Sequence, residues 1–458
     1  MTDEHTYSST TTNTRSILPA DMISVEDART RILQQFARLD LIDHALLDSV
    51  GQVIATNIIA TFNIPPLANT AMDGYAVRAA DTTGATYDTP LQLNVIGYLP
   101  AGEIFDGTVA PGQAVRIMTG APIPPGADSV VPFEETDEYG PSPTSDEDLS
   151  TRTSVRIDVA ANPGANIRDA GEDIRDGQTV LPAGTIIGPA QIGVLASLGL
   201  DRVPVYRRPV VAILSTGDEL LRPGQLLQPG KIYDSNAFSL AAQVQSFGGI
   251  PRVLDVARDT VEALTTRIHE GLADADLLVT SAGVSRGDFD VVKTVLANEG
   301  RVGFWTVKMK PGKPLAFGTF TTADGRLVPH LGLPGNPVSA MLTFELFGRA
   351  AIFKMLGKEN AWPRPLIRAT ATDRIRNTDG RRFYARVILD ETNYGTPTVS
   401  LTGPQSSGIL TSMALATAFA ICPEDTESIE PGEQCDVILI DRERTLYGPV
   451  SGTPASGY

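Results

Sequence analysis

Residues 210–220 read VVAILSTGDEL, in which five apolar residues run into a polar turn that contains a glycine. Such a run is typical of a strand that is buried on both faces of a sheet. From here to about residue 355, further apolar runs alternate with segments that have helical apolar spacing. Because strands that alternate with helices form mostly parallel sheets covered on both faces, this region is predicted to be a doubly wound α/β domain.

The predicted α/β domain contains five strand segments and four helical segments. The expected strands lie within residues 210–220, 251–259, 276–283, 314–320 and 327–335. The expected helices lie within residues 236–249, 260–275, 288–300 and 336–357. Several of the strands run into polar turns, which is where ligands bind in sheets of this type.

The rest of the chain is expected to hold helical and β-rich regions. Residues 24–59 have helical apolar spacing, and their first residues, SVED, resemble a helix-capping start. From about residue 60, short alternating runs separated by Gly and Pro predict a small β-domain. Residues 188–200 again have helical spacing, and antiparallel strands of a last β-domain are expected after about residue 361.

Length and charge limit the possible classes of protein. The chain has 458 residues, more than one hydrophobic core usually serves, so three or four structural units are expected. It carries 37 Lys and Arg against 54 Asp and Glu, and this net charge of −17 argues against a general nucleic-acid or membrane binder. Residues 1–21 are polar and rich in Ser and Thr, so we expect a disordered tail there.

Common catalytic and metal-binding patterns are missing from the sequence. Cys422 and Cys435 are too few for a disulfide framework and lack the spacing of a zinc site, so a reducing, cytoplasmic setting is expected. The four histidines show no metal spacing, and the phosphate-loop, dinucleotide and H-E-x-x-H patterns do not occur. The remaining candidates for functional residues are therefore the acids, lysines and glycines in the turns.

Polar turns follow expected strands at residues 215–220, 258–259, 281–290 and 333–337. Ligands of open α/β sheets bind outside the carboxyl ends of the strands. Four such turns together indicate a binding site more strongly than any single motif does. A net-acidic chain that binds an anion must also gather its few cations at such a site.

The stretch LPGNPVS, residues 333–339, has two interpretations. Gly335 permits an unusual backbone turn, Asn336 suits a helix N-cap and Pro337 suits the first helical position. A helix that starts this way presents free N–H groups to an anion. A plain strand-to-helix turn would have the same residues, so the motif alone decides neither way.

The stretch MKPGKP, residues 309–314, places Lys310 and Lys313 on a tight turn. Lysine is a compact cation suited to phosphate or oxyanion contact. A solvated pair of loop lysines is an equal alternative for this motif alone. Lys308, just before the turn, and Arg286, on the glycine-flanked loop SAGVSRGD, could join the pair.

Three acids, Glu219, Asp259 and Asp290, lie at three separate strand ends. Taken singly, each acid could be a helix-start residue stabilised by the helix dipole. Acids beside a phosphate site commonly hold Mg²⁺ or act as bases. Acids and lysines at one sheet edge together favour metal-assisted phosphoryl or nucleotidyl chemistry.

Eight motifs occur in the order and approximate spacing of one enzyme family. They are PPLANTAMDGYA, RIMTGAPIPPGADSVV, IRDAGEDI, STGDEL, IYDSN, SAGVSRGDFD, MKPGKP and LPGNPVS. In these motifs the chain resembles the MoeA family, the molybdopterin molybdenumtransferases, which are related to the E domain of gephyrin. The resemblance covers about residues 22–445, and the number and order of the motifs make it specific.

The resemblance implies an elongated, four-domain chain that forms a homodimer. A split N-terminal domain would comprise residues 22–59 and 160–206, with a β-domain inserted at residues 60–159. The doubly wound α/β domain, which is similar to MogA, would span residues 207–355. A C-terminal β-barrel-like domain would span residues 356–458.

The resemblance also implies an activity in molybdenum cofactor biosynthesis. Enzymes of this family take adenylylated molybdopterin, molybdate and Mg²⁺, cleave the adenylate, insert molybdenum into the dithiolene and release AMP. Besides a second copy, partners that the resemblance allows are the molybdopterin adenylyltransferase and maturation proteins of molybdoenzymes. Two alternatives stay open, namely the adenylylation step itself and a gephyrin-like interaction scaffold.

The motifs carry the family's functional positions onto this sequence. The catalytic residues that the resemblance implies are Glu219, Asp259, Asp290, Asp73, Thr119, Asp173, Lys310 and Lys313. Of these, the three acids of the α/β domain would also hold Mg²⁺. In the family, Asp73, Thr119 and Asp173 complete the cleft, partly from the other subunit. The implied nucleotide, pterin and molybdate positions are Ser215, Thr216, Gly217, Asp218, Ser281, Gly283, Gly335, Asn336, Ser339, Arg386 and Ser407.

Two features depart from the family pattern. Thr306 stands where many relatives have a lysine before the MKPGKP motif, and Lys308 could compensate for it. The acidic, Pro- and Ser-rich segment at residues 134–150 is longer than the family leads us to expect. We expect this segment to be an exposed, mobile loop, with a functional acidic site as the alternative.

Overall fold

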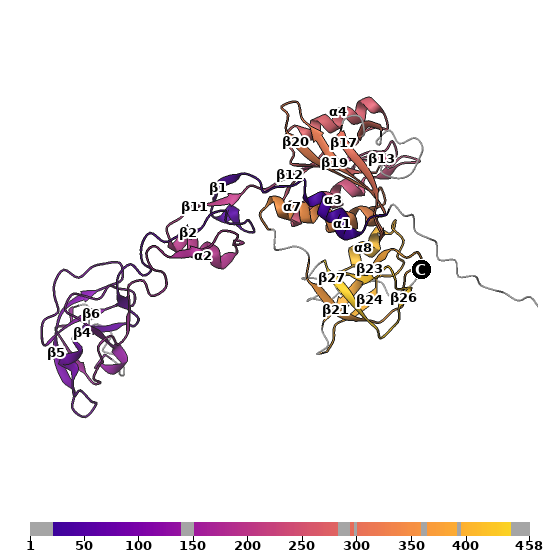
Figure 1. Ribbon diagram of the computed structural model, residues 1–458. Coiled ribbons are helices and arrows are strands. Elements are labelled where there is room, and N and C mark those ends of the chain that lie inside the picture. Colours follow the sequence, from indigo (N-terminus) through magenta and orange to yellow (C-terminus); the bar gives the residue numbers. More distant parts are fainter. Residues whose placement is uncertain are drawn as a thin grey trace, which may run out of the picture. The chain divides into compact units, whose positions relative to one another are not determined.

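The computed structural model describes most of the chain (Figure 1). The described residues are 22–138, 151–282, 294–296, 300–358, 364–391 and 395–440. The predictions for the tail at residues 1–21, for Gly283, Arg286 and Asp290 and for most of the acidic segment fall outside these ranges. The chain divides into two compact units. Unit 1 comprises Met1–Ile42, Gly51–Ala55 and Pro204–Tyr458, and unit 2 comprises Asp43–Val50 and Thr56–Val203.

A six-stranded sheet lies at the centre of unit 1, in the strand order β15–β12–β16–β20–β19–β17. The strands are β12 (Val210–Ser215), β15 (Ile250–Val253), β16 (Leu277–Ser281), β17 (Gly300–Thr306), β19 (Pro314–Thr321) and β20 (Leu327–Leu333). The first four strands in this order pair in parallel, whereas β19 pairs antiparallel with both β20 and β17. The predicted α/β alternation is confirmed, and β17 is a strand that the sequence did not reveal.

Helices cover both faces of this sheet, as predicted. α3 (Ser235–Ser246) and α7 (Arg349–Met355) share one core cluster with Ile213, and α4 (Val261–Leu272) shares the other with Leu214 (Figure 1). Successive side chains of a strand point to opposite faces. Both faces of β12 are therefore buried, which explains why the run VVAIL has no polar residue.

The carboxyl ends of five strands lie at one edge of the sheet. β12, β15, β16 and β20 are parallel, so their carboxyl ends share an edge. β17 points the same way as β20 because both are antiparallel to β19, and β17 leads into the MKPGKP turn. The described parts of the polar turns singled out in the α/β region therefore lie at this edge.

The segment after β20 is one helical run with a change of winding. α6 (Pro337–Thr343) continues into a π-helical turn, η5 (Phe344–Gly348), and then into α7. A π turn is in effect one extra residue inserted in an α-helix. Glycine is required at position 348, because a Cβ there would lie 2.2 Å from atoms of the Phe344 ring.

The C-terminal part of unit 1 is a closed β-barrel. Its strands follow the order β23–β24–β21–β27–β25, and β25 pairs back onto β23. They are β21 (Leu366–Ala371), β23 (Arg382–Asp390), β24 (Thr398–Leu401), β25 (Ala418–Cys422) and β27 (Gln434–Leu439). The pairings are antiparallel, as predicted, except for the parallel pair β21–β24. The other elements of this region are β22 (Ile375–Arg376), α8 (Leu410–Leu415) and β26 (Ser428–Ile429).

Two connections join the barrel to the α/β part of unit 1. β18 (Met309–Lys310), in the MKPGKP turn, pairs in parallel with the start of β23. α1 (Val25–Leu33) packs against α7, and the Lys354 amine donates to the carbonyl of Leu33 at 2.7 Å. Glu26 of α1 also forms an ion pair with Arg382 of β23.

The helix predicted at the start of the chain is much shorter than its apolar spacing indicates. The capping start is confirmed, because the backbone N–H of Asp27 donates to Ser24 Oγ at 3.0 Å. The helix then ends at Leu33, and β1 (Leu41–Ala45) follows. Short apolar runs fit helical and extended periods equally well, so spacing alone was misleading beyond Leu33. None of the helices in the described part of the chain is long and apolar enough to span a membrane.

Unit 2 contains a five-stranded sheet in the order β7–β4–β6–β5–β8. The strands are β4 (Gly74–Val77), β5 (Leu91–Leu99), β6 (Gln113–Ile117), β7 (Ser129–Pro132) and β8 (Ser154–Ile157). Short antiparallel pairs join β2 (Ile58–Ile59) to β10 (Thr179–Leu181) and β3 (Asn69–Thr70) to β9 (Ile167–Arg168). α2 (Pro189–Ser197) is the helix predicted within residues 188–200, and β11 (Arg202–Tyr206) leads the chain into unit 1.

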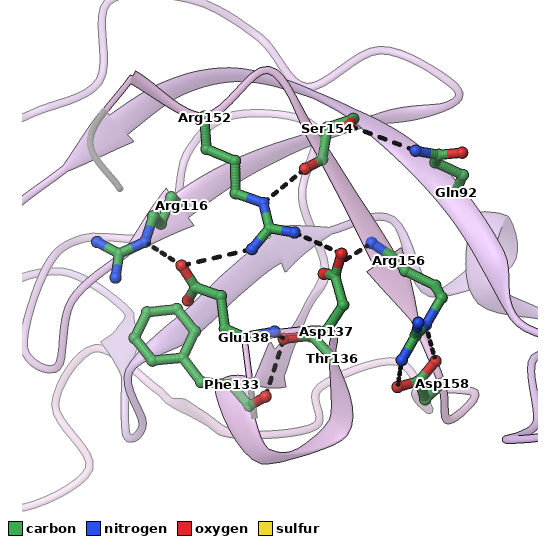
Figure 2. Close-up of polar contacts among 10 residues, drawn as sticks. All are labelled: Gln92, Arg116, Phe133, Thr136, Asp137, Glu138, Arg152, Ser154, Arg156 and Asp158. Carbon is green, nitrogen blue, oxygen red and sulfur yellow. Dashed lines mark hydrogen bonds and ion pairs between the residues drawn. The ribbon is translucent and has the colours of Figure 1, made fainter. Parts of the chain in front are cut away.

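Ion pairs tie together the two ends of the acidic segment (Figure 2). Near the start of the segment, Glu138 pairs with Arg116 at 2.9 Å, and Asp137 pairs with Arg152, beyond the segment, at 2.5 Å. The Arg116 guanidinium also lies 4.6 Å from the centroid of the Phe133 ring. These contacts fix the places where the segment leaves and rejoins the sheet.

Candidate active site

A pocket of about 260 Å³ lies at the carboxyl edge of the sheet in unit 1. Its lining includes Ser215, Thr216, Glu219, Asn236, Ser281, Gly335 and Gly408. Five of these residues were proposed as site residues from the sequence, and they come from the turns after three different strands. The structure therefore brings them together around one cavity.

The turn after β16 has an unusual backbone. Ala282 has a φ of 85°, a conformation that residues other than glycine rarely adopt. Its N–H donates to the carbonyl of Leu333 at 3.1 Å, which ties this turn to the end of β20. A Cβ added at Gly335 would lie 3.4 Å from the Ala282 Cβ, so the two turns are in close contact. Strained backbone of this kind often marks a functional site.

Asn236 connects three elements at the pocket. Its side-chain amide donates to Ser281 Oγ at 2.8 Å and to the carbonyl of Gly335 at 2.7 Å. Asn236 lies in the first turn of α3, whose N-cap is Asp234, and the Asp234 carboxylate accepts from the N–H of Ala237 at 3.0 Å. Sequence reasoning assigned Asn236 no role. Its place two residues after a helix-capping aspartate was the signal that could have identified it.

The turn that carries Glu219 lies against the turn that carries Asp259. The N–H of Gly217 donates to the carbonyl of Ala257 at 3.3 Å, and the N–H of Asp259 donates to Asp218 Oδ1 at 3.4 Å. Gly217 has a φ of 145°, and a Cβ there would lie 2.5 Å from Glu219 Oε2. Glycine is therefore required for the carboxylate of Glu219 to fold back over its own turn.

Both acids of these turns, Glu219 and Asp259, are exposed to solvent. In the described ranges, no cluster of three or more His, Cys, Asp or Glu is arranged to hold a metal ion. Asp290, the third acid expected at this edge, lies outside those ranges. Asp218 lines a neighbouring, more open pocket of about 700 Å³, together with Lys231 and Arg258.

The MKPGKP turn lies against the helix that follows LPGNP. Gly312 has a φ of 98°, and a Cβ there would lie 2.6 Å from Thr343 Oγ1 of α6. Lys310 is drawn toward the barrel, with its amine 3.5 Å from Asp379 Oδ2 and 5.6 Å from the centroid of the Phe383 ring. The MKPGKP turn therefore packs against the end of the helix that LPGNP begins.

The charged groups around Lys310 change the pKa of Asp379. Burial alone would raise the pKa of Asp379. The hydrogen bond and charge of Arg381, with the charge of Lys310, outweigh burial and lower that pKa. Asp379 therefore stays ionised and holds Lys310 in place. Lys313 has a half-buried side chain, and its carbonyl accepts from the N–H of Val307 at 2.8 Å.

A barrel loop reaches the start of α6. The N–H of Val338 donates to the carbonyl of Ser407 at 3.2 Å, so one helix-start amide is already used within the protein. Asn336 occupies the N-cap position without a side-chain capping bond, and Ser339 in the first turn is buried. Fewer backbone N–H groups at the start of α6 therefore remain free for an anion than the LPGNPVS motif indicates.

Arg386 holds this barrel loop from inside. Its side chain is fully buried, and it donates to Ser412 Oγ at 2.6 Å and to the carbonyls of Pro404 and Ser406 at 3.1 and 3.0 Å. Burial lowers its pKa to about 10. Its Nη1 atom is buried and has no hydrogen-bond partner among the described residues. One nitrogen of this buried cation is therefore left unpaired within the described part of the chain.

Unit 2 carries the remaining three predicted site residues. The N–H and the hydroxyl of Thr119 both donate to Asp73 Oδ1, at 2.6 and 2.7 Å. These hydrogen bonds lower the pKa of Asp73, which keeps its carboxylate ionised. Asp173 is exposed, and its N–H donates to the carbonyl of Ile64 at 3.0 Å. Asp73 and Thr119 thus form one polar group in unit 2.

Three family profiles match consecutive parts of the chain. Residues 23–199 match the MoeA N-terminal region (domain I and II), and residues 212–354 match a probable molybdopterin binding domain. Residues 368–440 match the MoeA C-terminal region (domain IV). The matched order agrees with the order of motifs in the sequence.

Relatives and solved structures agree over nearly the whole chain. Molybdopterin molybdenumtransferase 2 of Mycobacterium tuberculosis is 37% identical over 422 residues, which are 91% of this chain and 99% of the relative. The molybdopterin molybdenumtransferase of a Nostoc species is 36% identical over 92% of this chain and 94% of its own. A crystal structure of a molybdopterin biosynthesis MoeA protein from Pyrococcus horikoshii superposes with a TM-score of 0.75 at 30% identity, covering 91% of this chain and 99% of that one. The chain belongs to the MoeA family, the molybdopterin molybdenumtransferases.

Proposed function

We propose that this protein inserts molybdenum from molybdate into adenylylated molybdopterin, with Mg²⁺, and releases AMP. The observation that carries this proposal is the gathering of three strand-end turns around one polar pocket that contains Glu219, Ser215 and Ser281. Membership of the MoeA family supports the proposal, because the relatives compared above are named molybdopterin molybdenumtransferases.

The pocket offers donors for a phosphate-bearing substrate. Ser215 and Ser281 place hydroxyl groups at adjacent strand ends, in register across the β12–β16 pair. The Ser215 hydroxyl is buried and has no hydrogen-bond partner among the described residues. A hydroxyl without a partner at the wall of a cavity can bind a ligand without first breaking a bond within the protein.

Cations for molybdate would come from the MKPGKP turn and from the barrel loop. Lys310 and Lys313 flank Gly312, which packs against α6, and Arg386 Nη1 has no hydrogen-bond partner among the described residues. Molybdate and the substrate are both anions, so the site must hold like charges close together. Fixed cations at such a site reduce this repulsion and orient the two reactants for transfer.

The residues present fit a role for Mg²⁺. The ion prefers hard oxygen ligands and commonly takes one or two carboxylates, completed by water and substrate phosphates. Glu219 and Asp259 are exposed acids on touching turns, so these two side chains would hold it. The bound ion would neutralise phosphate charge as the adenylate is cleaved. The chain's own part is to fix these carboxylates, which Gly217 and the Ala257 contact do.

Further parts of the proposal concern assembly and setting. We infer a homodimer in which Asp73, Thr119 and Asp173 of one copy act on substrate held by the other copy. Its domains would be a split N-terminal domain at residues 22–59 and 160–206, a β-domain at 60–159, an α/β domain at 207–355 and a C-terminal domain at 356–458. A cytoplasmic setting fits the two buried, free thiols of Cys422 and Cys435. The molybdopterin adenylyltransferase and maturation proteins of molybdoenzymes would be transient partners upstream and downstream of this reaction.

The test is an assay in which the purified full-length chain turns over adenylylated molybdopterin with molybdate and Mg²⁺. The release of AMP is measured. Glu219→Gln should lower the rate by about 100-fold or more, because it removes one of the two carboxylates that hold the ion. Removal of Mg²⁺ with a chelator should lower the wild-type rate to a similar level.

Glu262→Gln is the matched control, because Glu262 is an exposed acid in the first turn of α4 and lies outside the pocket. It should leave the rate unchanged. If the wild-type chain released no AMP under these conditions but formed adenylylated product from molybdopterin and ATP, the proposed function would be wrong.

A further inference from the structure

A second pocket, of about 220 Å³, lies where α1, the π turn η5 and the barrel meet in unit 1. It shares no lining residue with the pocket at the sheet edge. Part of its wall is apolar, with Val25, Leu346, Ala350, Leu366, Ile421 and Ile438. The rest is charged, with Glu26, Arg29, Glu345, Arg349, Arg364 and Arg382, and Tyr384 completes the lining.

Guanidinium groups outnumber carboxylates in this wall by four to two. Glu345 Oε1 lies 2.5 Å from Arg364 Nε and 3.8 Å from Arg349 Nε, so one carboxylate serves two cations. Glu26 forms an ion pair with Arg382 at 2.5 Å. Glu424, outside the lining, also pairs with Arg382 at 3.1 Å, so one guanidinium more than carboxylates remains at this cavity of a chain with a net charge of −17.

Arg349 and its partner Glu345 are largely removed from water. The side chain of Arg349 is only 11% exposed, and that of Glu345 is 4% exposed. Burial lowers the pKa of Arg349 to about 10, and the nearby charge of Arg364 acts in the same direction. Holding positive charges together away from water is unfavourable, and a bound anion would relieve that cost.

The guanidinium of Arg349 is held in a fixed plane. It lies 4.3 Å from the centroid of the Phe353 ring, one turn further along the helix. A guanidinium fixed in this way presents parallel N–H donors that match the two oxygens of a carboxylate. The apolar wall beside it suits a ligand with a hydrocarbon body.

We propose that this pocket binds a small organic anion that has one carboxylate and a compact apolar body, with Arg349 and Arg364 as the residues that bind its charge. The cavity is smaller than the roughly 300 Å³ at which pockets for drug-sized ligands begin, so a single ring or a short branched chain fits. Because the wall combines α1, the helix at residues 344–355 and the barrel, the ligand would join three separate parts of unit 1.

Calorimetric titration of the full-length chain with benzoate tests the proposal, with neutral benzamide as the isosteric comparison. Benzoate should bind and benzamide should bind at least about tenfold more weakly, because a hydrogen bond to a charged group is stronger than a neutral one. Inorganic phosphate, which has no apolar body, should also bind more weakly than benzoate.

Arg349→Met and Arg364→Met should each weaken benzoate binding by about tenfold or more. Arg368→Met is the matched control, because Arg368 also lies on the barrel but is 60% exposed and paired with Asp436, outside the pocket. Circular dichroism identifies a variant that fails to fold. In that case benzoate binding by the other pocket variant decides the test.

The proposal is overturned if benzoate binds no tighter than benzamide to the wild-type chain. It is also overturned if Arg368→Met weakens benzoate as much as the folded pocket variant does. Benzoate should in addition raise the thermal midpoint of the wild-type chain, since a ligand that binds only the folded state stabilises it.

Discussion

At the scale of single residues, Asn236 shows why the sequence did not identify every part of the site. Its two side-chain hydrogens are both used, one on Ser281 and one on the carbonyl of Gly335. Its place after the capping Asp234 marks a helix start, but the sequence does not reveal the partners of Asn236, which are 45 and 99 positions away in the chain. Glu219 and Asp259, by contrast, could be predicted because each follows an apolar strand.

Asn236→Asp should lower the rate of AMP release at neutral pH, because a carboxylate cannot donate to the Gly335 carbonyl. As the pH falls, the new carboxyl group takes up a proton and regains one donor. The rate of this variant relative to wild type should therefore rise from pH 7 to pH 5. A pH profile of AMP release with both proteins measures this ratio.

Asn236→Leu is the control for this experiment, because its side chain has no proton to gain. Its rate relative to wild type should stay flat over the same pH range. Equal pH profiles for the Asp and Leu variants would show that the hydrogen bond to Gly335 is not what matters.

Arg386 could be identified as a site residue from its motif, but its burial could not be predicted from the sequence.

At the scale of elements, the alternation of strands and helices was predictable, whereas the pairing of distant strands was not. The runs at β12, β16 and β20 are mostly apolar and buried because helices cover both faces of the sheet. The strand β17, Gly300–Thr306, carries two glycines and exposed positions, so it gave no such signal. Closure of the barrel through β23 and β25 depends on side-by-side packing of strands that the sequence separates.

Strand β20 carries a histidine that should make stability depend on pH. His330 is completely buried, Nε2 lies 2.9 Å from Thr280 Oγ1, and burial lowers its pKa to about 3. In the unfolded chain the pKa is near 6.5, so between these two values only the unfolded state binds the proton. Stability from this group is complete above about pH 6.5 and is lost as the pH falls toward 3.

His330→Gln should reduce the slope of unfolding free energy against pH by up to about 1.4 kcal/mol per pH unit between pH 6 and pH 4. Glutamine keeps a polar group near Thr280 but does not titrate. Urea unfolding followed by tryptophan fluorescence measures both slopes. The carboxylates titrate in both proteins, so only the difference between slopes matters, and identical slopes would contradict the prediction.

The π turn η5 leads to a second prediction, which concerns the stability of the helix at residues 337–355. Glycine to alanine inside a helix normally stabilises by about 0.5–1 kcal/mol. Gly348→Ala should instead destabilise by about 1–3 kcal/mol, because its Cβ would collide with the Phe344 ring. Differential scanning calorimetry measures the change in thermal midpoint.

Gly193→Ala is the matched control for the π turn. Gly193 lies within α2, and a Cβ there would meet no atom within 4 Å. Its midpoint should therefore stay the same or rise. If Gly348→Ala also left the midpoint unchanged or raised it, the close approach at the π turn would not be a constraint on this helix.

At the scale of the whole molecule, the proposed site residues divide between the two units. Glu219 and Asp259 belong to unit 1, whereas Asp73, Thr119 and Asp173 belong to unit 2. Sequence motifs place residues in chain order, and chain order does not say which copy of a protein supplies each residue. The proposal that two copies share each site therefore requires its own experiment.

Glu219→Gln and Asp73→Asn chains should each release little AMP alone and recover activity when refolded together. If sites are shared in a two-fold dimer, half of the mixed dimers are heterodimers and each has one intact site. The mixture should then regain about a quarter of the wild-type rate. AMP release by the refolded mixture measures this, and a rate no higher than the average of the two variants would exclude sharing.

The packing of α1 determines the order in which the chain can finish folding as it is synthesised. Unit 2 is complete once residue 203 has left the ribosome, whereas α1 needs Lys354 for the bond to Leu33 and Arg382 for the ion pair with Glu26. Synthesis proceeds at about 5–20 residues per second, so this helix waits roughly 20–70 seconds for its partners. During that time its apolar face is exposed, and a chaperone that binds nascent chains would find it there.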